Sequence, residues 1–487
     1  MLFNSLEFIF LFLPSVFFIY FYLNKSKLEY PPKIFLVFSS LLFYSWWNPK
    51  YLLIIIISMI FNYLIGTRLA KRSEYMGGGN KNLLLCGILG NISLLGYFKY
   101  SDFFIVNLNN SIGTQISLLN LVLPLAISFF TFQQIAYLVD CFHQKAKTYD
   151  FLNYSLFVSF FPQLIAGPIV HHNEMMPQFY SSKNKVINHK NIAAGFFLFS
   201  IGLFKKVVIA DNFAIWANLG FDNSHALNIF EGWVTSLSYT FQLYFDFSGY
   251  TDMAIGTALL FNIVLPINFN SPYKSKNIQE FWKRWHITLS RFLKDYIYIP
   301  LGGNRKSNFI TYRNMLVTFI LGGFWHGAGW TFLFWGFLHG LAIIIYRIWF
   351  NLQIRIWGWL SWFITFNFIN ISWIFFRAKT MGDATNIITS MFNIKQLEFM
   401  ININIKKLFI TNFSSNGQLF NNFGEVNEIS ILVLLLIGFL LVLLFTNSTN
   451  KIKNLKFSFI SALATSLAFC YSLYSISKTS EFLYFNF

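Results

Sequence analysis

The chain has 487 residues, of which 55% are hydrophobic and 11% are charged. Soluble globular proteins carry roughly 25% charged residues, so the composition excludes that class and predicts a protein that crosses a membrane many times. The net charge of +17 does not indicate a nucleic-acid partner, because the Lys and Arg residues lie in short loops between apolar runs. That arrangement is typical of cytoplasmic loops in membrane proteins. The three widely separated cysteines predict no disulfide framework.

The apolar runs predict the membrane spans in chain order, and several are close to the ~20 residues that a helix needs to cross a bilayer. The first run has no basic leader and no small-residue cleavage site, so we interpret it as a retained helix. Basic residues after the first, third and fifth runs predict an external N-terminus. The expected spans are 2–23, 33–47, 51–66, 83–98, 117–140, 192–210, 232–262, 311–323 paired with 328–346, 356–376, 429–446 and 457–475.

Two other segments have a distinctive composition. Residues 151–170 are apolar but contain Pro162 and Gly167-Pro168. Because proline removes a backbone donor, this segment is predicted to be re-entrant and packed inside protein. Residues 380–428 are polar and rich in Asn, which predicts an external loop, and residues 429–487 carry the further C-terminal spans.

Two acidic residues, Asp246 and Asp252, lie within the apolar run 232–262. Ionisable groups at membrane depth are costly, and they mark functional paths. The pair has two interpretations at this stage. It either caps a helix that is broken at Gly249, or it lines a polar cavity.

The most basic region is 274–313, which holds nine basic and two acidic residues, a net charge of +7. Cytoplasmic placement follows from the positive-inside rule. Its aromatic and cationic centre is typical of an amphipathic helix in the headgroup layer. Alternatively, some of the cations bind an anionic cytosolic ligand, for which Lys and Arg are well suited, while His286 points inward.

A second histidine, His326, lies in the Gly- and Trp-rich sequence GGFWHGAGWTFLFWGFLHG of residues 322–340. The preceding apolar arm, 311–323, has 13 residues and reaches only ~20 Å as a helix, less than the ~30 Å hydrocarbon core. Gly327 and Gly329 permit a turn, so the sequence predicts a hairpin with His326 at membrane depth. Such a histidine is either functional or a buried group that hydrogen-bonds a neighbouring helix.

The chemistry that these residues support is proton transfer. A neutral imidazole in a dry site is a suitable general base for an alcohol that attacks an acyl carbon. The sequence has no nucleophile elbow, dinucleotide loop or Walker motif. His171 and His172 are adjacent, but no second cluster has ligand spacing, so no metal site is predicted. Acyl transfer and a transport pore both remain open.

Several motifs resemble one known family. FWHGAGWTFLFWGFLHG is similar to the signature of the membrane-bound O-acyltransferase superfamily. KRWHITLSRFLKDYIYIPLGGNR, YFDFSGYTDMAIG, FFPQLIAGPIVHHNEMMPQF, MLFNSLEFIFLFLP, LFYSWWNPKYLL and ISWIFFRAKT resemble the branch that contains the alginate O-acetyltransferase membrane subunit. The resemblance covers residues 1 to about 385 of a single domain, 1–487. One departure is His171, where the branch would have Arg.

The resemblance implies an all-α polytopic fold of about eleven transmembrane helices plus re-entrant segments around a central channel. It implies catalytic roles for His326, which matches the superfamily histidine, and for His286, which matches a second one. It further implies no bound cofactor, acetyl-CoA as the acyl donor, and a multi-pass location in the bacterial inner membrane. The implied partner is a periplasmic SGNH-like acetyltransferase or a glycan-export complex.

We therefore expect an O-acetyltransferase that moves acetyl groups from a cytosolic donor to an exported polysaccharide, alginate or another glycan. His326 would be the general base, and His286 would guide the acyl group or polarise its carbonyl. The supporting residues are expected to be Trp285 and Trp325 as channel walls, Asp246 as a hydrogen-bond partner of a histidine, and His339. The alternatives are D-alanyl transfer, peptidoglycan acylation and a non-catalytic acyl-group transporter.

Overall fold

The computed structural model describes residues 1–26, 28–76, 80–146, 150–165, 167–225, 227–394, 428–453, 458–477 and 483. Every regular element in these ranges is a helix, which confirms the predicted all-α class. Six helices are long and apolar enough to cross a membrane: Glu7–Lys25, Tyr51–Lys71, Lys81–Ile112, His189–Asp222, Trp330–Asn351 and Gly358–Arg377. Three shorter apolar helices accompany them, and the count of about eleven spans stays a prediction.

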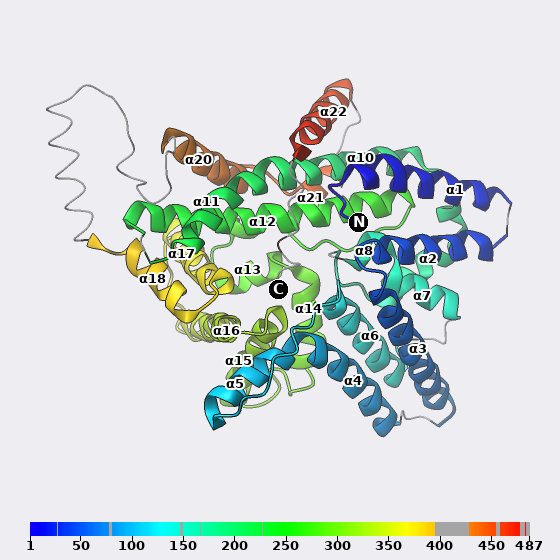
Figure 1. Ribbon diagram of the computed structural model, residues 1–487, viewed down its shortest axis with the longest axis horizontal. Helices are drawn as coiled ribbons and strands as arrows, with labels where there is room; N and C mark the ends of the chain where they lie inside the picture. The colour runs from blue at the N-terminus through cyan, green and yellow to red at the C-terminus, as the bar shows by residue number, and fades with distance from the viewer. Residues whose placement is uncertain are drawn as a thin grey trace. The chain divides into compact units, whose positions relative to one another are not determined.

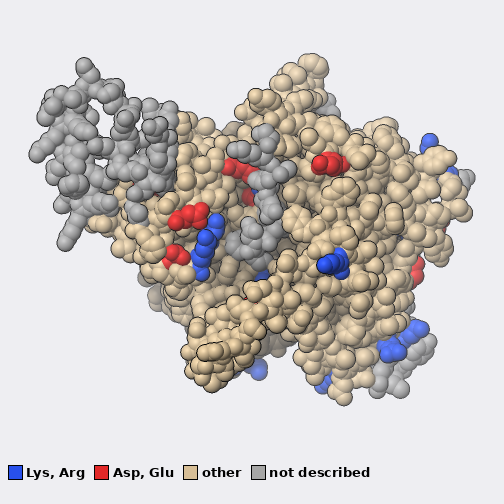
Figure 2. Space-filling model, viewed as in Figure 1, with Lys and Arg blue, Asp and Glu red and all other residues tan. Residues whose placement is uncertain are grey.

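The chain forms two compact units. The first contains Met1–Phe204, Gly249–Asn268 and Lys451–Phe487, and the second contains Lys205–Ser248 and Phe269–Asn450. On the face drawn in Figure 2, Lys, Arg, Asp and Glu are few, and uncharged residues cover most of the described surface. Such a surface suits contact with lipid, where isolated charges are costly.

The first unit is built from the N-terminal helices, α10, α22 and the part of α12 (Ile229–Leu260) from Gly249 onward (Figure 1). Its helices are η1 (Glu7–Phe12), α1 (Leu13–Lys25), α2 (Tyr30–Ser45), α3 (Tyr51–Met76), α4 (Lys81–Leu95), η2 (Gly96–Tyr100), α5 (Ser101–Ile112), α6 (Ile127–Phe142), α7 (Phe151–Ser159), α8 (Phe161–Leu164), α9 (His172–Tyr180), η3 (Ser182–Lys185), α10 (His189–Phe204), α22 (Phe459–Tyr474) and η8 (Ser475–Ser477). Both α3 and α4 pack on α6, and buried amides join them, since Asn62 bonds both Asn91 (3.1 Å) and Gln134.

The structure modifies one expectation in this unit and agrees with another. The apolar run 117–140 is helical only from Ile127, because the chain before it is irregular, and Asp102 accepts the backbone N–H groups of Leu119 (2.7 Å) and Asn120 (3.0 Å). The segment 151–170 is interrupted as its prolines suggested, with short helices α7 and α8 on either side of Phe160.

The second unit contains the remaining helices. They are η4 (Lys205–Ala210), α11 (Asp211–Asp222), the first part of α12 (Ile229–Leu260), η5 (Pro272–Lys274), α13 (Ile278–Arg284), α14 (Ile287–Leu293), η6 (Lys294–Tyr298), α15 (Asn308–His326), α16 (Trp330–Asn351), α17 (Gly358–Arg377), α18 (Met381–Met391), α20 (Glu428–Leu444) and α21 (Ser448–Lys453). Because α12 continues through Gly249, the interpretation of Asp246 and Asp252 as caps of a broken helix is wrong. Most of the expected external loop, residues 395–427, lies outside the described residues.

The helices α15 and α16 form the expected hairpin, and glycines bring them close together. A Cβ atom on Gly323 would lie 2.3 Å from the backbone oxygen of Phe332, and one on Gly336 would lie 2.4 Å from that of Phe319. Small residues permit this kind of approach between membrane helices. Gly327 and Gly329 have extended backbones, with φ of −158° and −163°, so the turn does not depend on left-handed glycine.

The first arm of the hairpin is longer than predicted. Helix α15 has 19 residues and therefore spans about 28 Å, instead of the ~20 Å expected from the apolar run alone. The polar residues at its start belong to the helix, since Ser307 caps it by accepting the N–H of Ile310. The predicted arm, which was expected to stop short of the far side of the bilayer, was therefore underestimated because only the apolar run was counted.

We predict that Gly336→Ala destabilises the protein by about 1–3 kcal/mol, because the added methyl group overlaps a backbone atom that cannot rotate away. Thermal unfolding of the purified protein in detergent, followed by tryptophan fluorescence, measures the effect. Gly329→Ala is the matched control, since its nearest neighbour would lie 3.5 Å away. Equal unfolding temperatures for the two variants would contradict the close-approach argument.

Candidate functional site

His326 is the last residue of α15, and its side chain is buried within the second unit. The residue is 4% exposed. Its ring lies 4.9 Å from the ring of Trp325, 5.3 Å from that of Trp335 and 5.1 Å from that of Phe376, measured between centroids. Aromatic groups from α15, α16 and α17 therefore surround the imidazole. Such surroundings exclude bulk water from the imidazole.

A row of tryptophans connects this histidine to the region of His286. Trp335 stacks on Trp373 at 5.6 Å with an interplanar angle of 18°, and Trp373 lies 5.0 Å from Trp285. Phe269 lies 5.0 Å from Trp285 and 5.0 Å from Phe247, and Phe247 lies 4.9 Å from His286. A continuous chain of rings in the second unit therefore connects the two predicted catalytic histidines. We define the aromatic cluster as His326, Trp335, Trp373, Trp285 and His286, the last joined through Phe269 and Phe247.

His286 lies at a special backbone position between α13 and α14. Its φ and ψ are 42° and 54°, in the left-handed region, and it is 0% exposed. A residue other than glycine in that region costs about 1–3 kcal/mol, and such residues gather at functional sites. The imidazole packs edge-on against Phe247 of α12, 4.9 Å away. The left-handed backbone at His286 directs its imidazole away from the cations of the basic segment and into the interior.

His339 has partners on both ring nitrogens. The indole N–H of Trp282 donates to Nδ1 (3.3 Å), and Nε2 lies 3.0 Å from Ser372 Oγ. Ser372 donates its own hydroxyl to the carbonyl of Ile369 (2.8 Å), so its oxygen accepts from His339 Nε2–H. This places the proton on Nε2 and defines a neutral, satisfied imidazole. His339 therefore joins α13, α16 and α17 through these hydrogen bonds.

A basic cavity of about 690 Å³ adjoins the cluster in the same unit. Trp282 lines it, and that indole also lies 5.9 Å from Trp335, which contacts His326. The cations of the cavity are Lys283, Lys294, Arg305, Lys306 and Arg347. Trp282 in the wall of the cavity therefore contacts Trp335, which is one of the rings that surround His326.

The buried side-chain amide of Asn314 holds a loop that also lines this cavity. Gly302 and Gly303, both lining residues, have φ of 110° and 55°, which only glycine adopts readily. Asn314 on α15 is 0% exposed, and its amide donates to the carbonyls of Leu301 and Gly303, each at 3.1 Å. The loop that carries Arg305 and Lys306 is therefore fixed to the same helix that carries His326.

The contact that the structure gives for Asp246 is an ion pair. Its carboxylate lies 2.6 Å from Lys206 Nζ, which also reaches Asp211 at 2.9 Å. The side chains of Lys206 and Asp246 are 4% and 2% exposed. The attraction of the two carboxylates offsets the free-energy cost of desolvating the buried ammonium of Lys206. A histidine partner for Asp246 stays a prediction, and Asp252 lies in the first unit.

Sequence reasoning missed several residues of this site. Trp335, Trp373 and Ser372 each lie in an apolar helix, where a tryptophan or serine gives no signal of its own, and Trp282 lies in the short, partly charged helix α13. Lys206 could have been found, because a lysine inside the apolar run 192–210 needs a carboxylate partner. The nearest buried carboxylates on neighbouring helices were then candidates.

Comparison with known proteins identifies the family of this chain. The profile of the membrane-bound O-acyltransferase family matches residues 87–382. The chain is 52% identical over 422 residues to a peptidoglycan O-acetyltransferase of Helicobacter pylori, with 80% of each chain covered. It is 40% identical to a probable alginate O-acetylase, AlgI, of Pseudomonas aeruginosa, over 81% of this chain and 75% of that one. A teichoic acid D-alanyltransferase of Streptococcus thermophilus is 29% identical over 49% of this chain and 59% of its own length.

A helical membrane protein with buried imidazoles beside a basic cavity fits the class of integral membrane acyltransferases. The chain belongs to the membrane-bound O-acyltransferase family. It is an O-acyltransferase, and the resemblance inferred from its motifs is confirmed.

We predict that Lys206→Met destabilises the protein by about 3–5 kcal/mol, because it leaves buried carboxylates without their cation. The double variant Lys206→Met/Asp246→Asn regains part of this loss, because the most buried of those charges is removed as well. Urea or thermal unfolding in detergent gives the comparison. If the double variant is no more stable than the single one, the ion pair does not stabilise the fold in this way.

Proposed function

We propose that this protein transfers acetyl groups from cytosolic acetyl-CoA across the bacterial inner membrane, for O-acetylation of an exported glycan. One observation carries the proposal: Trp282 in the wall of the basic cavity contacts Trp335, and Trp335 contacts His326. The cavity proposed for a phosphate-bearing donor and His326, the proposed general base, are thus separated by the indoles of Trp282 and Trp335. The aromatic cluster between them is apolar, like an acetyl group.

The reaction follows from the buried imidazole. An acceptor hydroxyl attacks the acetyl carbonyl carbon, and His326 takes the hydroxyl proton as the O–C bond forms. The C–S bond of the thioester breaks, and the thiolate of coenzyme A leaves and is protonated. His286, presented by its left-handed backbone, would donate to the carbonyl oxygen, where negative charge develops. Exclusion of water by the surrounding rings would protect the thioester from hydrolysis.

Charge supports the choice of donor. Five cations line the cavity, and the phosphates of coenzyme A are the type of anion that Lys and Arg bind well. The positive-inside pattern of residues 274–313 favours access from the cytosol. In the aromatic cluster, by contrast, the polar groups are imidazoles and indoles. The donor's charged end and its acetyl end therefore have different complementary environments.

The comparisons favour peptidoglycan as the acceptor, because the peptidoglycan O-acetyltransferase is 52% identical to this chain and the alginate O-acetylase 40%. An alginate-like glycan is the second candidate. D-Alanyl transfer has weaker support, since the D-alanyltransferase relative is 29% identical over half of this chain. A periplasmic SGNH-like acetyltransferase or a glycan-export complex would receive the acetyl group outside the membrane.

We predict that His326→Ala lowers glycan O-acetylation by about 10²–10⁴-fold, because the general base is lost. Mass spectrometry of peptidoglycan from cells with equal membrane levels of each variant measures the O-acetyl content. His225→Ala is the control, since that histidine lies in the same unit with a side chain 79% exposed. Normal acetylation by His326→Ala would exclude the mechanism.

The same mass spectra separate the alternative acyl groups and acceptors. A mass increase of D-alanine in place of acetyl, or acetyl on a different glycan, would overturn the proposed substrate but keep the proposed base. Purified protein in sealed vesicles tests the transporter alternative. Release of coenzyme A in step with acetyl transfer favours the enzyme, and flux of acetyl-CoA without that release would contradict it.

We further predict that the double variant Lys294→Ala/Arg305→Ala raises the KM for acetyl-CoA by about tenfold and changes kcat little, because two solvent-screened phosphate contacts are lost. Lys379→Ala is the control, because Lys379 is exposed, pairs with Asp222 at 3.5 Å and lies outside the cavity lining. Initial rates of coenzyme A release, measured at several salt concentrations, give KM and kcat. A fall in kcat at unchanged KM would remove the cavity from donor binding.

A further inference from the structure

We propose that the first unit carries a binding groove for an anionic phospholipid along helix α1, with Lys25 as the headgroup contact. The groove has a volume of about 410 Å³. Its lining is almost wholly apolar, from Phe17, Phe18, Ile19 and Phe21 of α1 together with Ile187 on the opposite side. This site lies in the first unit and does not depend on the proposed acetyl transfer.

The floor of the groove is held by aromatic packing. Phe17 lies 4.9 Å from Phe21 and 6.1 Å from Phe261, and Phe21 is 5% exposed. The rim, by contrast, is open, because Phe18 is 69% exposed and Ile187 is 42% exposed. A fixed apolar floor with an open apolar rim suits a hydrocarbon chain, which then needs little reorganisation of the protein.

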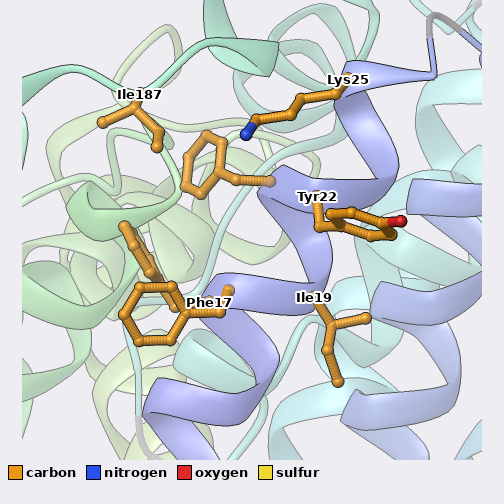
Figure 3. Close-up of a pocket in the computed structure, with 7 residues that line it drawn as sticks. Phe17, Ile19, Tyr22, Lys25 and Ile187 are labelled. Carbon is orange, nitrogen blue, oxygen red and sulfur yellow. The ribbon is translucent and has the colours of Figure 1, made fainter.

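The groove lies along a membrane-spanning helix and ends at a cation. Residues Glu7–Lys25 form one of the six helices that are long and apolar enough to span a bilayer, and Lys25 is the last residue of α1. Figure 3 shows its side chain extending over the groove toward the side of Ile187, while the Tyr22 hydroxyl points away from it. A lysine at a helix end places its charge at the level of the lipid headgroups.

Lys25 has no carboxylate partner in the part of the chain that the structure describes. The nearby acid in the sequence, Glu29, is occupied, because it binds Lys33 Nζ at 3.0 Å and lies close enough to Lys185 for an electrostatic interaction. The hydrogen bond from Lys33 and its charge lower the pKa of Glu29, which keeps that carboxylate ionised and paired. An ammonium over an apolar groove fits an anion that carries an acyl chain, and a neutral lipid would leave that charge unused.

Native mass spectrometry of the purified full chain, with phosphatidylglycerol or phosphatidylcholine of identical chains, tests the proposal. The wild-type protein should retain phosphatidylglycerol preferentially. Lys25→Gln should reduce that preference by about fivefold, the effect of one basic residue at an anionic surface. Lys81→Gln is the matched control, since Lys81 is also exposed and at a helix end of the same unit. Ile187→Trp, which narrows the groove, should reduce retention of both lipids.

Three outcomes would overturn the inference. The first is equal retention of the two lipids by the wild-type protein. The second is a preference that survives Lys25→Gln or falls equally with Lys81→Gln. The third is a dimeric protein in which Ile187→Trp breaks the dimer and leaves lipid binding unchanged, because a second copy of the chain would then occupy the groove.

Discussion

The close approach of α15 and α16 is the constraint on which the site depends. Gly323 and Gly336 face the other helix's backbone at distances that no side chain permits. Trp335 is the neighbour of Gly336, and its ring crosses that of His326 at 89°. A wider hairpin would move this indole away from the imidazole. Gly323 and Gly336 therefore act through their lack of a side chain, which lets α15 and α16 approach closely. The aromatic cluster depends on this close approach.

The three buried histidines of the second unit have different surroundings, and these surroundings divide their roles. His339 is held in one tautomer by Trp282 and Ser372, so its nitrogens are committed to structure. His326 lies among aromatic rings at the end of a helix, and His286 is turned inward by a left-handed backbone. The two hydrogen bonds of His339 link three helices, which suits a supporting position beside the proposed general base, His326.

The sequence predicted the features that depend on composition and on local motifs. It correctly indicated an all-helical membrane protein, the hairpin around His326 and the family. It could not indicate partners across helices, because a Trp or Ser in an apolar run has no distinguishing pattern. The same limit applies to Asp246, whose partner Lys206 is 40 positions earlier in the numbering. Helix ends were missed where polar residues extend a helix, as at the start of α15, and where an apolar run is irregular, as before Ile127.

The separation of charge from the imidazoles follows from how the basic segment folds. Its cations, such as Lys294 and Arg305, line the basic cavity, while Trp285 and His286 of the same segment are buried. If the cations lay in the aromatic cluster, they would favour neutral histidine but would also cost several kcal/mol each to desolvate. Placed in the cavity instead, they would attract the proposed anionic donor at little cost. Trp282 lines the cavity and contacts Trp335 of the cluster, so it forms the boundary at which the proposed donor's phosphates would end and its acyl group begin.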